Sequence, residues 1–208
     1  MKEVKNIPFD YNERLEAVLN TSWNLFKSQF IHKRHYILTE APFQHHFADI
    51  LRQVGNLFCL TRDDIFLVDL ETKSKSLNGK TKYIDITCEF VNKIKCAIEL
   101  KFKTAKQGAQ DHGRIDMYRD IEALEYVCSE DYDLGKFYAI TDSQTYINKS
   151  KVGVGTVFCT HNGNKSNENK TFWYNSKGRE NIKVLLRNSY LFNWENINEW
   201  YFLDLSIK

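Results

Sequence analysis

The 208-residue sequence predicts an α/β (α+β) fold in which a central mixed β-sheet is flanked by helices. Apolar residues recur at helical spacing up to about residue 55, and the period changes to two from about residue 65. A further helical pattern then interrupts the alternating segments. The resulting order of helices, three strands, helix, strand and more strands is typical of a layered fold with helices packed on a sheet.

The first helix is predicted over about residues 11–30. Asp10 followed by Glu13 resembles a capping box, in which side chains satisfy the free backbone N–H groups of a helix start. The apolar stripe of this helix comprises Leu15, Val18, Leu19 and Phe26.

A second helix is predicted from about residue 39 to Gly55. Thr39 is suited to the N-cap, and Pro42 falls in the first turn, where its missing N–H does no harm. Gly55 is a natural C-terminal stop. The apolar stripe comprises Phe43, Phe47, Ile50, Leu51 and Val54.

Alternating patterns predict the strands that follow. Residues 65–70 form one strand and 73–80 a loop, and residues 83–90 and 94–102 form an antiparallel hairpin joined by the polar break at 91–93. A helix is then predicted over 114–128. The remaining predicted strands are 136–141, 152–159, 171–174, 184–187 and 200–207.

We expect one domain, because 208 residues suffice for a single substantial core. Within it we expect a catalytic core over 38–142, an N-terminal helical extension over 1–37 and a C-terminal β-rich elaboration over 143–208. No stretch approaches the roughly 18 apolar residues of a membrane span, so a cytoplasmic protein with no membrane partner is expected. Five irregularly spaced cysteines without a CxxC pair favour reduced thiols.

The register of the predicted hairpin decides which side chains meet. A three-residue loop at 91–93 places Asp85 opposite Glu99, whereas a two-residue turn places Asp85 opposite Leu100. Only the three-residue loop makes the apolar rows of the two strands coincide, so burial favours it. Lys101 follows Glu99 on the same face.

Two carboxylates and an ammonium group on adjacent strands indicate metal-assisted attack on a phosphate. Mg²⁺, with Mn²⁺ as an alternative, prefers such oxygen ligands. Asp85, Glu99 and the backbone carbonyl of Leu100 are the candidate ligands. We expect Lys101 to orient the attacking water or to stabilise the transition state. The alternative is an exposed strand face with an ordinary ion pair.

Glu40 is a further candidate catalytic residue. It falls within the apolar stripe of the second helix and therefore points toward the protein. Two interpretations are open: Glu40 interacts with the helix dipole, or it reaches the metal through water.

The order of these residues resembles the PD-(D/E)xK nuclease superfamily, the restriction-endonuclease-like fold. The matched pattern, over about residues 38–142, is a helix with Glu40, a strand with Ile84-Asp85, a strand with Glu99-Leu100-Lys101, a helix and a strand. Ile84 replaces the proline of the motif. The resemblance implies a mixed sheet with helices on both sides and Mg²⁺-dependent hydrolysis of nucleic-acid phosphodiesters. It also implies metal binding by Asp85 and Glu99, and DNA cleavage that many members perform as homodimers.

The net charge of +2 gives no global basic field, so a nucleic-acid enzyme must concentrate its positive charge locally. Basic and amide side chains near the predicted site are candidates for nucleic-acid contacts, and a solvated surface is the alternative. These residues are Lys82, Lys103, Lys106, Gln107, Gln110 and Arg114.

The sequence therefore predicts a Mg²⁺-dependent endonuclease, with DNA as the expected substrate and restriction or defence as a possible setting. Two alternatives remain open: a catalytically silent nucleic-acid-binding protein of the same fold, and a nuclease that acts on RNA.

Overall fold

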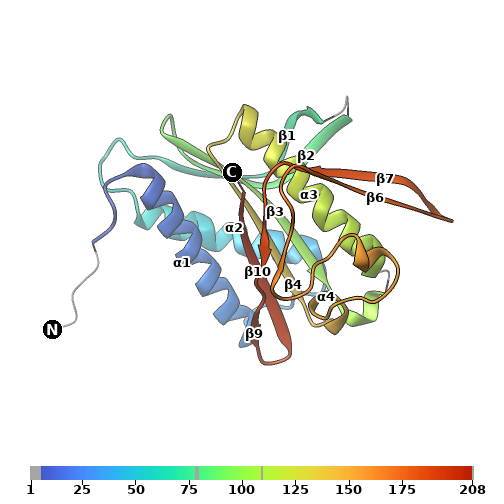
Figure 1. The fold of residues 1–208 in the computed structure, drawn as a ribbon. Coiled ribbons are helices and arrows are strands. Elements are labelled where there is room, and N and C mark those ends of the chain that lie inside the picture. Colours follow the sequence, from blue (N-terminus) through green and yellow to red (C-terminus); the bar gives the residue numbers. More distant parts are fainter. Residues whose placement is uncertain (1–5, 78–79, 109, 208) are drawn as a thin grey trace.

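The computed structural model describes residues 6–77, 80–108 and 110–207, and its central feature is a six-stranded mixed sheet (Figure 1). The strand order is β1-β2-β3-β4-β10-β9, and β3 and β4 are the parallel pair among the described strands. The strands are β1 (Phe66–Leu77), β2 (Lys80–Phe90), β3 (Ile94–Lys103), β4 (Leu134–Thr141), β9 (Glu195–Ile197) and β10 (Trp200–Ile207).

Helices cover both faces of this sheet. On one face α1 (Tyr11–Ile31) and α2 (Glu40–Leu57) bury an aromatic-rich core against β2 and β3. On the other face α3 (Gln110–Glu130) connects β3 to β4 and packs on a second core (Figure 1). No helix in the described ranges combines the length and the apolar character needed to cross a bilayer.

Short elements and two small sheets complete the chain. They lie mainly after β4, where β5 pairs with β8 and β6 pairs with β7. They are η1 (Ala105–Gln107), α4 (Gln144–Ile147), η2 (Val154–Thr156), β5 (Asn164–Lys165), β6 (Lys170–Ser176), β7 (Arg179–Leu186) and β8 (Leu191–Phe192).

The predicted helix starts are confirmed in position, with different capping. Asp10 Oδ1 accepts the N–H groups of Asn12 and Glu13 at 2.9 and 3.1 Å, so the first half of a capping box is present. Thr39 occupies the N-cap of α2 without a side-chain hydrogen bond. Gly55 does not end α2 as predicted, because it is buried inside a helix that continues to Leu57.

Two secondary-structure predictions are wrong: the loop over 73–80 and the strand over 152–159. Most of the loop expected over 73–80 is strand, because β1 runs to Leu77 and β2 starts at Lys80; residues 78–79 lie outside the described part. The strand expected over 152–159 is absent from that segment, which holds η2 instead. Gly153 has φ 72°, and buried Val154 and Phe158 are spaced as on a helical turn.

The predicted hairpin register is confirmed. Ile86 pairs with Ile98 and Thr87 with Ala97, the alignment that makes the apolar rows coincide. The ladder ends at Ile86–Ile98, one position before the expected opposition of Asp85 and Glu99. Beyond that point β2 continues beside β1 alone.

The core extends beyond residues 38–142. Helix α1 shares one apolar cluster with α2, and β10 lies in the central sheet beside β4. The N-terminal helix and the C-terminal strand are therefore parts of the same packed unit as the candidate site.

Gly55 marks a close contact between α2 and β1 that is open to test. A Cβ atom at this position would overlap ring carbons of Phe66, a buried residue. We expect Gly55→Ala to lower the free energy of unfolding by about 1–3 kcal/mol, as overpacking does. Thermal unfolding should show a Tm lower by roughly 2–12 °C. Asn56→Ala, at the exposed neighbouring position, is the control and should leave Tm nearly unchanged; equal Tm values for both variants would contradict the contact.

Candidate functional site

The candidate site lies where β2 and β3 part. In a continuing antiparallel ladder, β2 would accept hydrogen bonds from the N–H groups of Leu100 and Phe102. Instead, Asp85 Oδ2 accepts the Leu100 N–H at 2.7 Å. Glu40 Oε2, at the start of α2, accepts the Phe102 N–H at 3.1 Å. Two acids thus replace a strand partner, and we call this place the fork.

Gln44 on α2 holds the other side of the fork. Its side-chain amide donates to the backbone carbonyl of Asp85 at 2.6 Å and to Glu71 Oε1 at 2.8 Å. Glu71 has φ 51°, and the β1–β2 pairing omits it between Leu70–Ile86 and Thr72–Ile84 without a shift in register. The Gln44 amide therefore ties α2 to both β1 and β2 beside the fork.

Two lysines link three acids into one network across the fork. Lys101 Nζ lies 3.2 Å from Glu40 Oε1 and 2.9 Å from Asp120 Oδ2. Lys82 Nζ lies 2.9 Å from Asp120 Oδ1 and 3.3 Å from Glu99 Oε1. Asp120 on α3 therefore bridges both lysines. Side-chain exposure rises from 5% at Glu99 to 37% at Glu40, so the network is open to solvent on the Glu40 side.

Asp85 and Glu99 resist ionisation. Burial raises the pKa of Asp85 to about 6, in opposition to the Leu100 N–H bond, and the negative charge of Glu40 adds to the rise. Burial and the negative charge of Asp120 raise the pKa of Glu99 well above its ordinary range. The fork therefore carries more negative charge than its environment stabilises, and either a proton or a cation relieves it.

The lysines remain protonated. Burial lowers the pKa of Lys101, but the carboxylates of Asp120 and Glu40 outweigh it, and the pKa rises above its ordinary value. At Lys82 the same balance, against Asp120 and Glu99, also raises the pKa. Neither amine can serve as a general base at neutral pH.

The residues at the fork fit a hydrated Mg²⁺ ion in donor type. The sequence-predicted donors are the oxygens of Asp85, Glu99 and the Leu100 carbonyl. Because N–H and C=O of one strand residue point to the same edge, the Leu100 carbonyl faces the fork along with its N–H. Mg²⁺ takes one or two carboxylates and keeps several waters. Within the described residues, no group of three or more His, Cys, Asp or Glu side chains is arranged to hold a metal ion.

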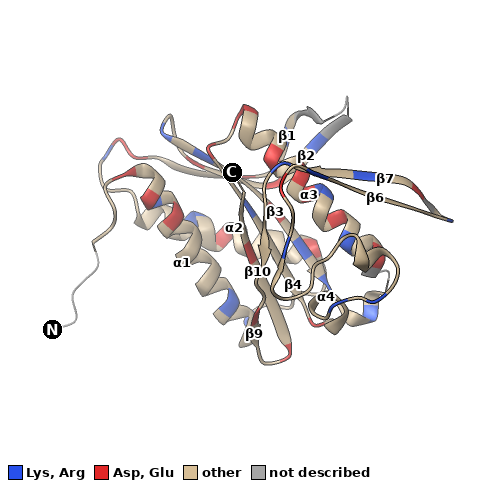
Figure 2. Ribbon diagram, in the orientation of Figure 1, with Lys and Arg blue, Asp and Glu red and all other residues tan. Residues whose placement is uncertain are grey.

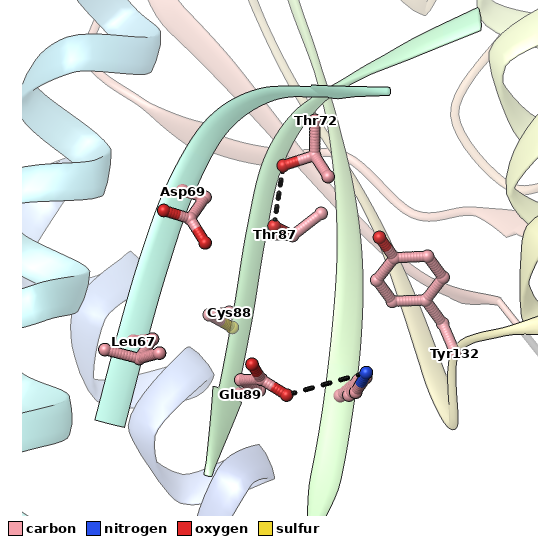
Figure 3. Close-up of a pocket in the computed structure, with 8 residues that line it drawn as sticks. Leu67, Asp69, Thr72, Thr87, Cys88, Glu89 and Tyr132 are labelled. Carbon is pink, nitrogen blue, oxygen red and sulfur yellow. Dashed lines mark hydrogen bonds and ion pairs between the residues drawn. The ribbon is translucent and has the colours of Figure 1, made fainter. Parts of the chain in front are cut away.

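A separate cavity lies farther along the same strands (Figure 3). It has a volume of about 160 Å³ and contains a hydrogen bond of 2.9 Å between Thr72 and Thr87. Among the residues that line this cavity, Glu89 Oε2 lies 3.8 Å from Lys95 Nζ. None of the fork residues lines this cavity, so its chemistry is distinct from that of the predicted site. The lining residues are Leu67, Asp69, Thr72, Thr87, Cys88, Glu89, Lys95 and Tyr132.

Two residues expected to contact nucleic acid have other positions in the structure. Arg114 is buried, and its guanidinium donates to the Thr145 carbonyl and the Ser150 hydroxyl. It therefore ties α3 to the following loops and is not available to a phosphate. Lys82 is largely covered and belongs to the fork network.

The other expected contact residues lie after β3. Lys103 is half-buried, while Lys106 and Gln107 are exposed. Gln107 Oε1 accepts the Thr104 N–H at 2.9 Å and caps η1. The side chain of Gln110 lies outside the described part of the structure.

Sequence reasoning missed Asp120 and Gln44. Asp120 lies three residues after Met117 and four before Leu124, within the apolar stripe of α3. Gln44 lies three residues before Phe47 on α2. A polar side chain on the buried face of a helix was the signal that identified Glu40, and the same signal was present for both residues.

The pKa of Asp85 predicts a measurable effect of pH on stability in buffer without divalent cations. The folded-state pKa of about 6 exceeds the ordinary 3.8, so the native protein binds the proton more tightly and loses stability as pH rises from about 4 to about 6. We expect Asp85→Asn, which can still accept the Leu100 N–H, to stabilise the protein by about 1–3 kcal/mol near pH 8 and to change it little near pH 4. Denaturant titrations across this range test it. Asp69→Asn, an exposed carboxylate on β1, is the control; a gain at pH 8 no larger than that of the control would contradict the prediction.

No protein-family model, curated protein or solved structure matches the chain.

Proposed function

We propose that this chain is a Mg²⁺-dependent endonuclease of the restriction-endonuclease-like type that hydrolyses phosphodiester bonds in DNA. One observation carries the proposal: acids from α2 and β2 and the Glu99–Lys101 pair of β3 converge at the fork. The hydrogen bonds to Leu100 and Phe102 and the ion pairs of Lys101 support this convergence. The arrangement matches, in chain order, the pattern on which the family resemblance rests.

The acids of the fork bind the metal in this proposal. Asp85 and Glu99, with the Leu100 carbonyl, would hold Mg²⁺, which would supply Lewis-acid chemistry to a phosphoryl oxygen and to a water. Their raised pKa values support the assignment, because a divalent cation offsets the burial and the neighbouring negative charge that raise them. The partly exposed carboxylate of Glu40, which contacts Lys101 and the Phe102 N–H, would receive the proton of the attacking water.

Lys101 stabilises charge rather than removing a proton. Its raised pKa keeps the ammonium group protonated, so its contribution is electrostatic and greatest when negative charge develops on the phosphate. Asp120 positions this group, since its carboxylate lies 2.9 Å from Lys101 Nζ. Lys82 similarly holds the Glu99 carboxylate at 3.3 Å.

Cleavage assays with site variants test the proposal. We expect Asp85→Ala and Lys101→Ala to lower the rate of duplex DNA cleavage in Mg²⁺ by about 100-fold or more, as loss of an electrostatic catalytic group does. Lys101→Ala should change binding far less than turnover, because its proposed role is specific to the transition state. Lys95→Ala, an exposed lysine on the same strand, is the control and should cleave at the wild-type rate.

The same assay separates the alternative functions. Single-stranded DNA and RNA are tested beside duplex DNA, each with Mg²⁺ and with chelator. Binding without cleavage of any substrate by wild type would identify a silent nucleic-acid-binding protein. Cleavage of RNA alone would identify a ribonuclease, and either outcome would overturn the proposal.

Metal binding can be measured without activity. A ligand that binds only the folded state at 100 times its Kd stabilises that state by about 2.7 kcal/mol. We therefore expect saturating Mg²⁺ or Mn²⁺ to raise the Tm of wild type by several degrees and to leave Asp85→Asn nearly unchanged. Asp69→Asn is the control and should respond as wild type does. An equal rise in Tm for wild type and Asp85→Asn would place the metal elsewhere.

A further inference from the structure

Strands β6 and β7 form a two-stranded ribbon whose turn extends beyond the body of the molecule (Figure 1). One side of the ribbon is apolar and packs in the core beneath α3, through Phe172, Ile182 and Val184. The other side faces solvent. On it, Trp173 and Lys183 are cross-strand partners, and Trp173 is 52% exposed. The solvent side therefore offers an exposed aromatic ring beside a cationic side chain.

The ribbon holds the local concentration of positive charge that the whole-chain sum conceals. Residues 170–187 contain five basic residues and one acid, a net charge of +4. Because the whole chain has a net charge of +2, the remaining residues have a net charge of −2. The basic residues are Lys170, Lys177, Arg179, Lys183 and Arg187, and the acid is Glu180.

These charges are not neutralised by neighbouring acids. Across the described residues, Lys177, Lys183 and Arg187 take part in no ion pair, and all three are exposed. Glu180 accepts the Gly178 N–H at 2.7 Å within the turn. Basic positions lie on β7 and at the far end of the ribbon in Figure 2. The ribbon therefore presents a positive potential to its surroundings.

Helix α3 connects the ribbon to the fork. Glu122 Oε1 accepts the Leu185 N–H at 2.7 Å, and Glu125 Oε2 accepts the Arg187 N–H at 2.8 Å. Asp120, two residues before Glu122 on the same helix, bridges the two lysines of the fork. A partner held by the ribbon would thus lie at a fixed position relative to the site.

We propose that the β6–β7 ribbon is a duplex-DNA-binding arm, with Lys177 and Lys183 in contact with backbone phosphates. The inference rests on the proposed nuclease function and specifies its substrate as double-stranded. The major groove of B-DNA admits a two-stranded ribbon, and strands of seven and eight residues are roughly 25 Å long, enough to cross it. A single-strand surface instead stacks successive bases on several aromatic rings, whereas the exposed side of this ribbon carries Trp173 alone among its well-exposed described aromatics.

Binding measured in chelator, where cleavage does not occur, tests the arm. We expect the Lys177→Ala/Lys183→Ala variant to bind duplex DNA about tenfold or more weakly than wild type does near 150 mM salt. The slope of log K against log salt should fall in magnitude by about 2, since each lost phosphate contact removes roughly 0.9. The Arg62→Ala/Lys93→Ala variant is the control. It removes two exposed cations that precede β1 and follow β2, outside the ribbon, and it should bind as wild type does. Lys177→Arg/Lys183→Arg should restore the wild-type Kd and slope.

The outcomes separate the arm from the nuclease. Wild-type Kd and slope in the alanine variant, or tighter binding of single-stranded DNA or RNA than of duplex by wild type, would overturn the arm. Arm-dependent duplex binding with no cleavage in Mg²⁺ would leave the arm in place and remove the nuclease. If the alanine variant cleaves duplex DNA at the wild-type rate at every salt concentration, the nuclease would stand and the arm would be removed.

Discussion

The hydrogen bonds that end the β2–β3 ladder determine the rest of the site. A buried backbone N–H needs an acceptor, and beyond Ile86–Ile98 the β3 donors no longer find one on β2. Asp85 and Glu40 supply carboxylate oxygens instead, and the Gln44 amide donates to the Asp85 carbonyl. The acids therefore complete the hydrogen bonding of the sheet, and on the proposed function the fork is where a phosphate and a metal would meet side chains from α2, α3 and both strands.

This arrangement favours a site that is costly without a ligand. Four acids and two lysines meet in a partly buried space, and burial raises the pKa values of Asp85 and Glu99. Removing one partner of such a network leaves an unbalanced buried charge, which is usually more destabilising than the intact network is stabilising. Loss of Asp120 would unbalance the network most, because its carboxylate contacts both lysines. Ionisable groups with strongly shifted pKa values cluster at functional sites, so such a network indicates function rather than a contribution to stability.

Periodicity in the sequence predicted the helices and the hairpin register because burial alone decides both. The coincidence of Ile86 with Ile98 follows from two apolar rows, and the face shared by Glu99 and Lys101 follows from strand alternation. Periodicity does not show where a ladder stops, so the fork and Gln44 were not predicted. Arg114 was assigned to the surface because the sequence does not reveal that loops with Thr145 and Ser150 cover it. Segment 152–159 was assigned to a strand because alternate residues include valines, although Gly153 breaks the extended backbone.

The distribution of charge connects the fork to the ribbon on the proposed function. Outside residues 170–187 the chain has a net charge of −2, and the fork concentrates acids, so a nucleic-acid phosphate approaching the fork alone is repelled. Two positive elements can offset that repulsion: a divalent cation held by the acids, and a basic arm whose contacts lie beyond the repulsive region. The first acts only at the reacting phosphate, whereas the second acts along the backbone and is weakened by salt. Because α3 carries both Asp120 and the glutamates that hold β7, the two elements share one rigid support, and binding by the arm contributes directly to positioning at the fork.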